Sequence, residues 1–223
     1  SKCGTADVLE ALGARIELSP EQVVRCVSAA GFGFVFAQKF HPAFRHVGPV
    51  RRELGVPTIF NLLGPMANPA AVAYMLVGVA NPGRMATMAA VLAQRTTASL
   101  VVHGHGGLDE LSLAGPNRVL ATRSEVVEAE SAVHAGDVGV ASAANEFLRG
   151  GDPAHNAQVV RDLLTNGLRG PIRDVVVLNA AAALHLTGAA VSLRAGATLA
   201  DATIKSGAGM AVLEAFIAES QRE

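Results

Sequence analysis

Short apolar runs of strand length alternate along this chain with longer segments that have helical periodicity. Alternation of this kind is typical of α/β proteins, in which helices cover a sheet, so the sequence predicts an α/β fold. The segments that we expect to form strands are the apolar runs 34–37, 72–80 and 99–104, together with 117–123. The segments that we expect to form helices are 5–12, 20 to near 31, 42–54, 84–95, 142–149, 153–166, 171–186 and 197–220.

Three of the predicted helices have clear boundary signals. Residues 5–12 are amphipathic and are followed by Gly13, a residue type that commonly ends a helix. The stretch SPEQ at 19–22 combines an N-cap serine, a proline at the first helical position and a glutamine three residues after the cap. The helix at 171–186 follows Gly170 and is apolar nearly all round, so we expect it to be buried at the centre of the fold.

Residues 54–83 carry no charge, which raises the question of a membrane segment. Four prolines break this stretch: Pro57, Pro65, Pro69 and Pro82. A second uncharged stretch, 175–193, is interrupted by polar residues such as Asn179. Because a spanning helix needs about 20 consecutive apolar residues, both stretches favour buried elements. The chain also opens with charged residues instead of a signal peptide, so we expect a soluble protein with no membrane partner.

The net charge and the cysteine content narrow the class of protein. The 18 basic and 19 acidic residues give a formal net charge of −1. A general nucleic-acid binder would need a broad basic surface, so we expect no nucleic-acid partner. Cys3 and Cys26 have neither metal-binding nor redox spacing, and so few thiols are typical of a protein in a reducing cytoplasm.

Cations and imidazoles gather between residues 39 and 52, in a chain of which only 17% is charged. The members of this cluster are Lys39, His41, Arg45, His46, Arg51 and Arg52. The planar guanidinium suits a carboxylate or a phosphate, so Arg51 or Arg52 is a candidate contact for an anion. The alternative is a solvated face with an ordinary ion pair, for example to Glu53. His41 and His46 are five residues apart, a spacing that does not place them on one helix face as metal ligands.

Two adjacent carboxylates, Asp109 and Glu110, follow a predicted strand and a glycine-rich turn. Open α/β sheets bind ligands at the carboxyl ends of their strands, and paired carboxylates there suit Mg²⁺ shared with substrate phosphates. The alternative is a solvated turn. His103 and His105 form an H-x-H pair with no third zinc ligand nearby in the sequence, and the glycines match neither the dinucleotide-binding motif nor the P-loop.

The first five residues, SKCGT, immediately precede the first predicted helix. Free N–H groups at a helix N-terminus bind anions, and Ser1 and Thr5 add hydroxyl groups to such a site. A plain N-cap explains the same residues equally well. The sequence leaves both interpretations open at this position.

These segments, in this order, resemble the anthranilate phosphoribosyltransferase family of tryptophan biosynthesis. The resemblance is carried by "GTADVLEALGARIELSPE", "FAQKFHPAFRHVGPVRRELGVPTIFNLLGPMANP" and "VVHGHGGLDEL", and runs from Ser1 into the C-terminal helices. It implies that residues 1–223 form the large domain of a nucleoside-phosphorylase/phosphoribosyltransferase-like fold, with a central mixed β-sheet flanked by helices. The implied reaction transfers the 5-phosphoribosyl group from phosphoribosyl pyrophosphate to anthranilate, with Mg²⁺ as cofactor.

The resemblance also implies roles for individual residues. Arg51, the first arginine of HVGPVRRE, is expected to meet the anthranilate carboxylate, and His41 of HPA is expected to line the path of this acceptor. Asp109 and Glu110 are expected to hold Mg²⁺. The residues whose hydroxyls are expected to contact the phosphoribosyl donor are Ser1 and Thr5.

Part of the family pattern is not found in these 223 residues. The glycine-rich GTGGD loop, a Lys-His-Gly-Asn segment and an N-terminal helical portion used for dimerisation are missing. We therefore expect a fragment, or a chain that has lost the family's first third, and a homodimer in the full-length protein. The alternatives are a pyrimidine nucleoside phosphorylase, which would lack the HPA…GPVRRELG stretch, and a non-catalytic relative that binds nucleic acid through a basic surface.

Overall fold

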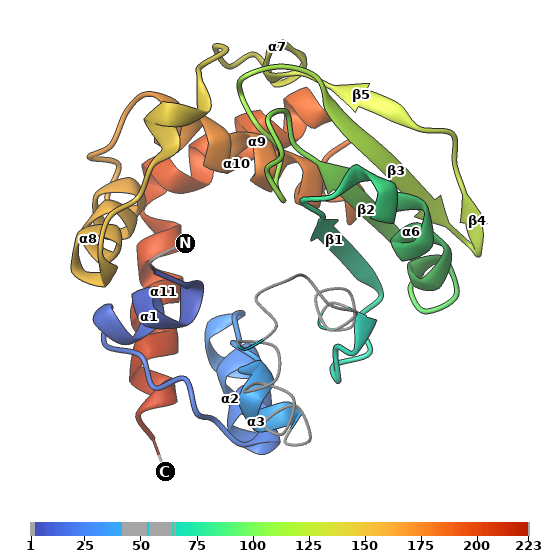
Figure 1. Ribbon diagram of the computed structural model, residues 1–223. Helices are drawn as coiled ribbons and strands as arrows, with labels where there is room; N and C mark the ends of the chain where they lie inside the picture. Colours follow the sequence, from blue (N-terminus) through green and yellow to red (C-terminus); the bar gives the residue numbers. More distant parts are fainter. Residues whose placement is uncertain (1–2, 42–52, 54–63, 65, 223) are drawn as a thin grey trace. The chain divides into compact units, whose positions relative to one another are not determined.

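The computed structural model describes residues 3–41, 53, 64 and 66–222, whose helices and strands are shown in Figure 1. The strands are β1 (Tyr74–Gly78), β2 (Ala98–His103), β3 (Asn117–Arg123), β4 (Val126–Val127) and β5 (Ser131–Val133). The α-helices are α1 (Thr5–Ala11), α2 (Pro20–Ala30), α3 (Ala37–Phe40), α6 (Met85–Ala93), α7 (Ala135–Val138), α8 (Pro153–Leu164), α9 (Pro171–Leu186), α10 (Leu193–Ser206) and α11 (Ala208–Ser220). The 3₁₀-helices are η2 (Pro82–Arg84) and η3 (Asn145–Leu148).

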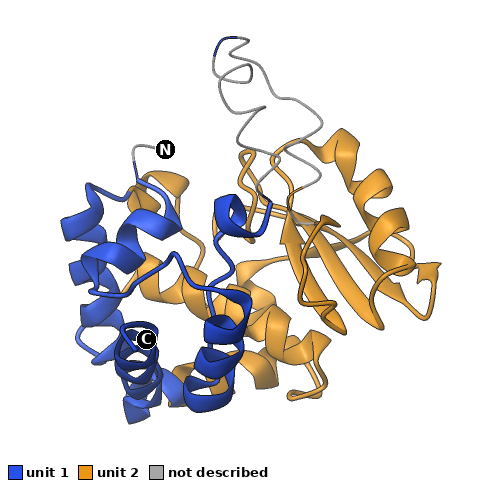
Figure 2. Cartoon of the chain, turned by 90° about the horizontal axis from the view of Figure 1, so that it is seen from below, with its two compact units in different colours: residues 1–61, 150–168, 203–223 blue, residues 62–149, 169–202 orange. Residues whose placement is uncertain are grey.

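The chain divides into two compact units, which are coloured separately in Figure 2. Unit 1 comprises residues 1–61, 150–168 and 203–223, and unit 2 comprises residues 62–149 and 169–202. All of the described strands belong to unit 2, whereas the described part of unit 1 is helical. No described helix is long and apolar enough to cross a membrane.

Unit 2 is built around a mixed sheet. Its described strands follow the order β1-β2-β3-β4, and β5 also pairs with β3. β1 and β2 are parallel, whereas β3 is antiparallel to each of its neighbours. The predicted α/β fold with a central mixed sheet is therefore confirmed.

The strand register places a row of apolar side chains beneath α6. Val77 is paired with Val101, and Val101 is paired in turn with Leu120. These three side chains belong to one buried cluster with Met88 and Leu92 of α6. Helix α9 contacts β1 and β2, and Figure 1 shows it on the far side of the sheet from α6. Helices on both faces account for the mainly apolar character of the parallel strands.

The core of unit 1 is formed by helices packed on one another. Phe216 of α11 is completely buried, and its ring meets Phe32 edge-on with the centroids 4.9 Å apart. Leu9, Leu18 and Cys26 belong to the same apolar cluster. Because aromatic rings are few in this sequence, aliphatic side chains supply most of this core.

The predicted start of α2 is confirmed in atomic detail. The Ser19 hydroxyl accepts from the backbone N–H of Gln22 at 3.3 Å, and the Gln22 amide oxygen accepts from the backbone N–H of Ser19 at 2.8 Å. The helix ends at Gly31, as expected. The strands predicted within 72–80, 99–104 and 117–123, and the helices predicted at 5–12, 84–95, 153–166 and 171–186, are confirmed within a few residues.

The strand predicted at 34–37 is wrong. The backbone is irregular up to Phe36, and Ala37 begins α3. Phe34, Val35 and Phe36 instead pack against the helical core of unit 1. A run of four apolar residues suits either environment, and the described part of unit 1 offers no strand with which it could pair.

Two of the predicted C-terminal helices are also wrong. Residues 142–149 contain only the short η3, and the α-helical turn α7 lies before them. The single helix predicted at 197–220 is two helices, α10 and α11, separated by Gly207 with φ of 74°. A glycine inside an apolar helical pattern does not by itself reveal a left-handed break. The helix predicted at 42–54 lies, apart from Glu53, outside the described residues.

We predict that Ser19→Ala lowers the free energy of unfolding by about 1 kcal/mol, because it removes the N-cap of α2 and leaves a helical N–H unpaired. The matched control is Ser28→Ala, at an exposed position inside the same helix. It should leave stability unchanged or slightly raised, since alanine is the better helix former. Denaturant unfolding of both variants checks this, and equal losses would contradict the role of the cap.

Candidate functional site

Asp109 and Glu110 lie where the parallel strands β1 and β2 end. After β2 the chain turns at Gly104 and folds back across the carboxyl ends of both strands. A Cβ added to Gly78 would overlap the backbone carbonyl oxygen of Asp109, and a Cβ added to Gly104 would overlap that of Glu110. The two glycines therefore allow the loop that carries Asp109 and Glu110, residues 105–112 and here called the acidic loop, to lie directly on the strand ends. This is the edge at which α/β sheets bind ligands.

Two asparagine side chains hold the beginning and the end of this loop. Asn117, at the start of β3, is completely buried and accepts from the backbone N–H groups of Ser112 at 2.7 Å and His105 at 3.2 Å. Asn145 of η3 accepts from the Ser112 hydroxyl at 2.7 Å and donates to the carbonyl of His105 at 2.9 Å. The loop between His105 and Ser112 is thus closed by side chains from two other elements.

A third asparagine contacts the residue that follows the acids. The Asn179 side chain, from α9, accepts from the Leu111 N–H at 2.9 Å and donates to the Leu111 carbonyl at 2.9 Å. Its amide nitrogen also donates to the carbonyl of Val175 at 2.9 Å. The sequence shows Asn179 only as a polar interruption of an apolar helix, and no local signal links it to a loop 68 residues away.

The two carboxylates are exposed side chains on adjacent residues. Although solvent reaches Glu110, partial burial raises the pKa of its carboxyl group, and the charge of Asp109 adds to this effect. Two carboxylates that disfavour each other's charge gain from a cation between them. The local electrostatics therefore suit a bound positive ion.

Mg²⁺ fits the donor set that this loop presents. It prefers oxygen ligands and is usually held by one or two carboxylates, with water and substrate phosphates completing its coordination. Within the described ranges, no three His, Cys, Asp or Glu side chains gather to enclose a metal. Asp109 and Glu110 thus suit an ion shared with a ligand better than a closed structural site.

The other predicted site residues are not part of this loop. Thr5 is the exposed first residue of α1, whose N-cap is Gly4, and the Gly4 N–H donates to the Asp7 carboxylate at 2.7 Å. His41 is half-buried at the end of α3. Thr5 and His41 belong to unit 1, whereas the acids belong to unit 2. Two predicted residues lie outside the described part of the chain: Ser1 and Arg51.

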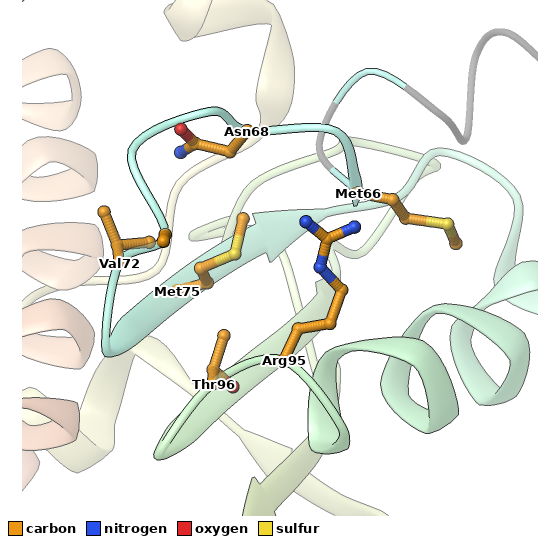
Figure 3. Close-up of a pocket in the computed structure, with 7 residues that line it drawn as sticks. Met66, Asn68, Val72, Met75, Arg95 and Thr96 are labelled. Carbon is orange, nitrogen blue, oxygen red and sulfur yellow. The ribbon is translucent and has the colours of Figure 1, made fainter.

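Unit 2 also has a small pocket near the amino-terminal ends of β1 and β2. Its volume is about 120 Å³, and in Figure 3 the guanidinium of Arg95 extends between the side chains of Met66 and Met75. The residues that line it are Met66, Asn68, Ala71, Val72, Met75, Arg95 and Thr96. The pocket therefore lies at the opposite end of these strands from Asp109 and Glu110 and contains neither of them.

The fold is that of a known class of transferase. Residues 1–210 match the model of the glycosyl transferase family, a/b domain, and the chain belongs to this family.

Within this family, the chain is similar to anthranilate phosphoribosyltransferases. The resemblance to these enzymes that the sequence motifs indicated is therefore confirmed. The chain is 50% identical over 222 residues to the anthranilate phosphoribosyltransferase of Roseiflexus sp. (strain RS-1), covering 99% of this chain and 65% of that protein. It is 52% identical over 217 residues to that of Thermomicrobium roseum, covering 96% of this chain and 62% of that protein.

Solved structures agree with these relatives. The crystal structure of anthranilate phosphoribosyltransferase from Thermus thermophilus matches with a TM-score of 0.91 and 44% identity, over 98% of this chain and 65% of that one. The Saccharomyces cerevisiae enzyme in complex with PRPP and Mg matches with a TM-score of 0.87 and 25% identity, over 97% of this chain and 62% of that one. The chain thus spans just under two thirds of the length of these proteins.

We predict that Gly78→Ala displaces the acidic loop, because the added Cβ overlaps the backbone of Asp109. Overpacking of this kind typically costs about 1–3 kcal/mol. The control is Gly136→Ala in the same unit, where a Cβ meets no atom within 4 Å. Thermal unfolding and amide hydrogen exchange at residues 109–111 check this. Unchanged stability and exchange in Gly78→Ala would show that the loop does not lie on the strand end.

Proposed function

We propose that this protein is an anthranilate phosphoribosyltransferase of tryptophan biosynthesis. It transfers the 5-phosphoribosyl group of phosphoribosyl pyrophosphate to anthranilate, which gives N-(5-phosphoribosyl)anthranilate and pyrophosphate. The observation that carries the proposal is the position of Asp109 and Glu110 at the carboxyl ends of β1 and β2, in a chain 50% identical to such an enzyme. Residues 1–223 then form its α/β phosphoribosyltransferase domain, in line with the family model that matches residues 1–210.

The reaction exchanges one bond at the ribosyl carbon for another. The amine nitrogen of anthranilate forms a bond to C1 of the ribose, the bond from C1 to the pyrophosphate oxygen breaks with its electron pair, and the amine loses a proton. Bound Mg²⁺ would supply neutralisation of the charge on the leaving pyrophosphate. Asp109 and Glu110 would hold this ion, and the complex of the Saccharomyces cerevisiae relative with PRPP and Mg supports the use of Mg²⁺.

The acceptor would be positioned by the cationic stretch that precedes β1. Arg51 would pair its guanidinium with the anthranilate carboxylate, and His41 would line the path to the reacting carbon. A related enzyme has been solved in complex with 4-fluoroanthranilate, which supports an aromatic acceptor. The aromatic amine is a weak base that loses its proton late in the reaction, so orientation of the acceptor matters more than a strong general base.

The donor would be contacted near the start of the chain. Ser1 and Thr5 would offer hydroxyl groups to the phosphoribosyl moiety, and Thr5 lies at the N-terminus of α1, where helical N–H groups favour an anion. We also propose that the full-length protein is a homodimer and works in the cytoplasm. The family resemblance supports the dimer, and the low cysteine content supports the reducing compartment.

The direct test is an assay of the natural protein with anthranilate, phosphoribosyl pyrophosphate and Mg²⁺. Equimolar consumption of anthranilate and release of pyrophosphate is the expected result. A parallel assay with a pyrimidine nucleoside and inorganic phosphate tests the alternative activity. Phosphorolysis in the second assay with no turnover in the first would overturn the proposed function.

Arg51→Ala should raise the KM for anthranilate far more than the KM for phosphoribosyl pyrophosphate. A charge-assisted contact contributes about 1.5–3 kcal/mol, which corresponds to roughly a 10- to 150-fold change. The matched control is Arg52→Ala, which removes the same side chain from the next residue, and the proposal assigns the acceptor contact to Arg51 alone. If Arg51→Ala raised the KM for both substrates equally, Arg51 would not be a contact for the acceptor carboxylate.

Asp109→Asn combined with Glu110→Gln should raise the Mg²⁺ concentration needed for half-maximal activity, or abolish turnover, while the protein stays folded. The control is Glu125→Gln combined with Glu128→Gln, which removes the same number of charges from exposed positions around β4. A Mg²⁺ titration of each double variant makes the comparison. If the Mg²⁺ concentration for half-maximal activity were unchanged in the Asp109→Asn, Glu110→Gln variant, the acidic pair would not be a metal site but an ordinary solvated turn.

A further inference from the structure

The Asn179 side chain pairs with both backbone groups of one residue. Its oxygen accepts from the Leu111 N–H and its nitrogen donates to the Leu111 carbonyl, each at 2.9 Å. A side-chain amide carries a donor and an acceptor side by side, so it can replace the two hydrogen bonds that a neighbouring strand would supply. Leu111 is only 1% exposed, so the protein rather than solvent must supply these partners.

Leu111 is the residue after the acidic pair, and this places the contact next to the carboxylates. The Asp109 carbonyl lies against Gly78 and the Glu110 carbonyl lies against Gly104. Three consecutive residues are therefore fixed in turn by the end of β1, the end of β2 and the amide on α9. Of these three contacts, only the one to Asn179 is made by a side chain.

We propose that Asn179 is a positioning residue for the metal site: by holding Leu111 it fixes the backbone from which Asp109 and Glu110 present their carboxylates to Mg²⁺. This inference rests on the proposed function. Mg²⁺ demands near-ideal octahedral geometry, so small displacements of its carboxylate ligands weaken binding. Groups that orient metal ligands without touching the metal typically change metal affinity by about 10- to 100-fold when they are mutated.

The chain offers a matched control for the same chemistry at another place. Asn156 of α8 accepts from the Gly151 N–H at 2.8 Å and donates to the Gly151 carbonyl at 3.1 Å. This pair of bonds has the same form as the Asn179 pair, but it lies in unit 1, whereas the acids lie in unit 2. The Asn156 pair is exposed whereas the Asn179 pair is part-buried, so thermal unfolding of both alanine variants is measured to separate a loss of stability from a change in Mg²⁺ dependence.

The test measures how Mg²⁺ strengthens the binding of phosphoribosyl pyrophosphate, by calorimetry over a series of free Mg²⁺ concentrations. We expect Asn179→Ala to raise the Mg²⁺ concentration that gives half of this effect by about 10- to 100-fold. Asn156→Ala should leave it within twofold of the unmodified protein. In steady-state kinetics, Asn179→Ala should shift the Mg²⁺ dependence of turnover while the KM for anthranilate changes by less than twofold.

A second variant keeps the test decisive if Asn179→Ala does not fold. Asn179→Asp keeps the size of the side chain and an acceptor for the Leu111 N–H, but it sets a carboxylate oxygen against the Leu111 carbonyl oxygen, so it should shift the Mg²⁺ dependence in the same direction. A Mg²⁺ dependence equal to that of the unmodified protein, in whichever variant folds, would overturn the positioning role. If the affinity of the unmodified protein for phosphoribosyl pyrophosphate did not depend on Mg²⁺, the metal site of the proposed function would be overturned instead.

Discussion

The close contact between the acidic loop and the strand ends is the constraint on which the candidate site depends. Gly78 and Gly104 have no side chain, so the backbone of Asp109 and Glu110 can cross the carboxyl ends of β1 and β2 at contact distance. The parallel pairing of these strands brings their ends to one edge, and α6 and α9 bury the sheet on which they lie. The sheet thus acts as a rigid support that holds two adjacent carboxylates side by side despite their mutual repulsion.

Elements with local signals can be predicted from the sequence. The reciprocal bonds of Ser19 and Gln22 involve residues three apart, and β1 and β2 are mainly apolar runs bounded by turn residues. The run at 34–37 lacks such a signal, because its environment is set by distant helices that the run itself does not specify. The break at Gly207 lacks one too, because a single φ angle, and not a change in composition, separates α10 from α11.

The candidate site also contains features with a local sequence signal and features without one. The two adjacent acids after a strand and a glycine turn can be noticed in the sequence, where a solvated turn explains them equally well, and the family resemblance is what makes them candidate metal ligands. The contact between the Asn179 amide and Leu111 cannot be predicted from the sequence. The two residues are 68 apart, and an isolated asparagine in a buried helix has many possible partners. Only the fold, which lays α9 against β1 and β2, makes the pairing visible.

The asparagine contacts to the loop have a consequence for how such a scaffold can evolve. Asn179 bonds only to peptide groups, and Asn117 and Asn145 bond to the loop mainly through peptide groups, which every amino acid except proline presents alike. The side chains at 109 and 110 can therefore be exchanged without removing the bonds that set the path of the chain. Natural variation can alter the chemistry at this edge while its shape is inherited, and one architecture can acquire new reactions by few substitutions.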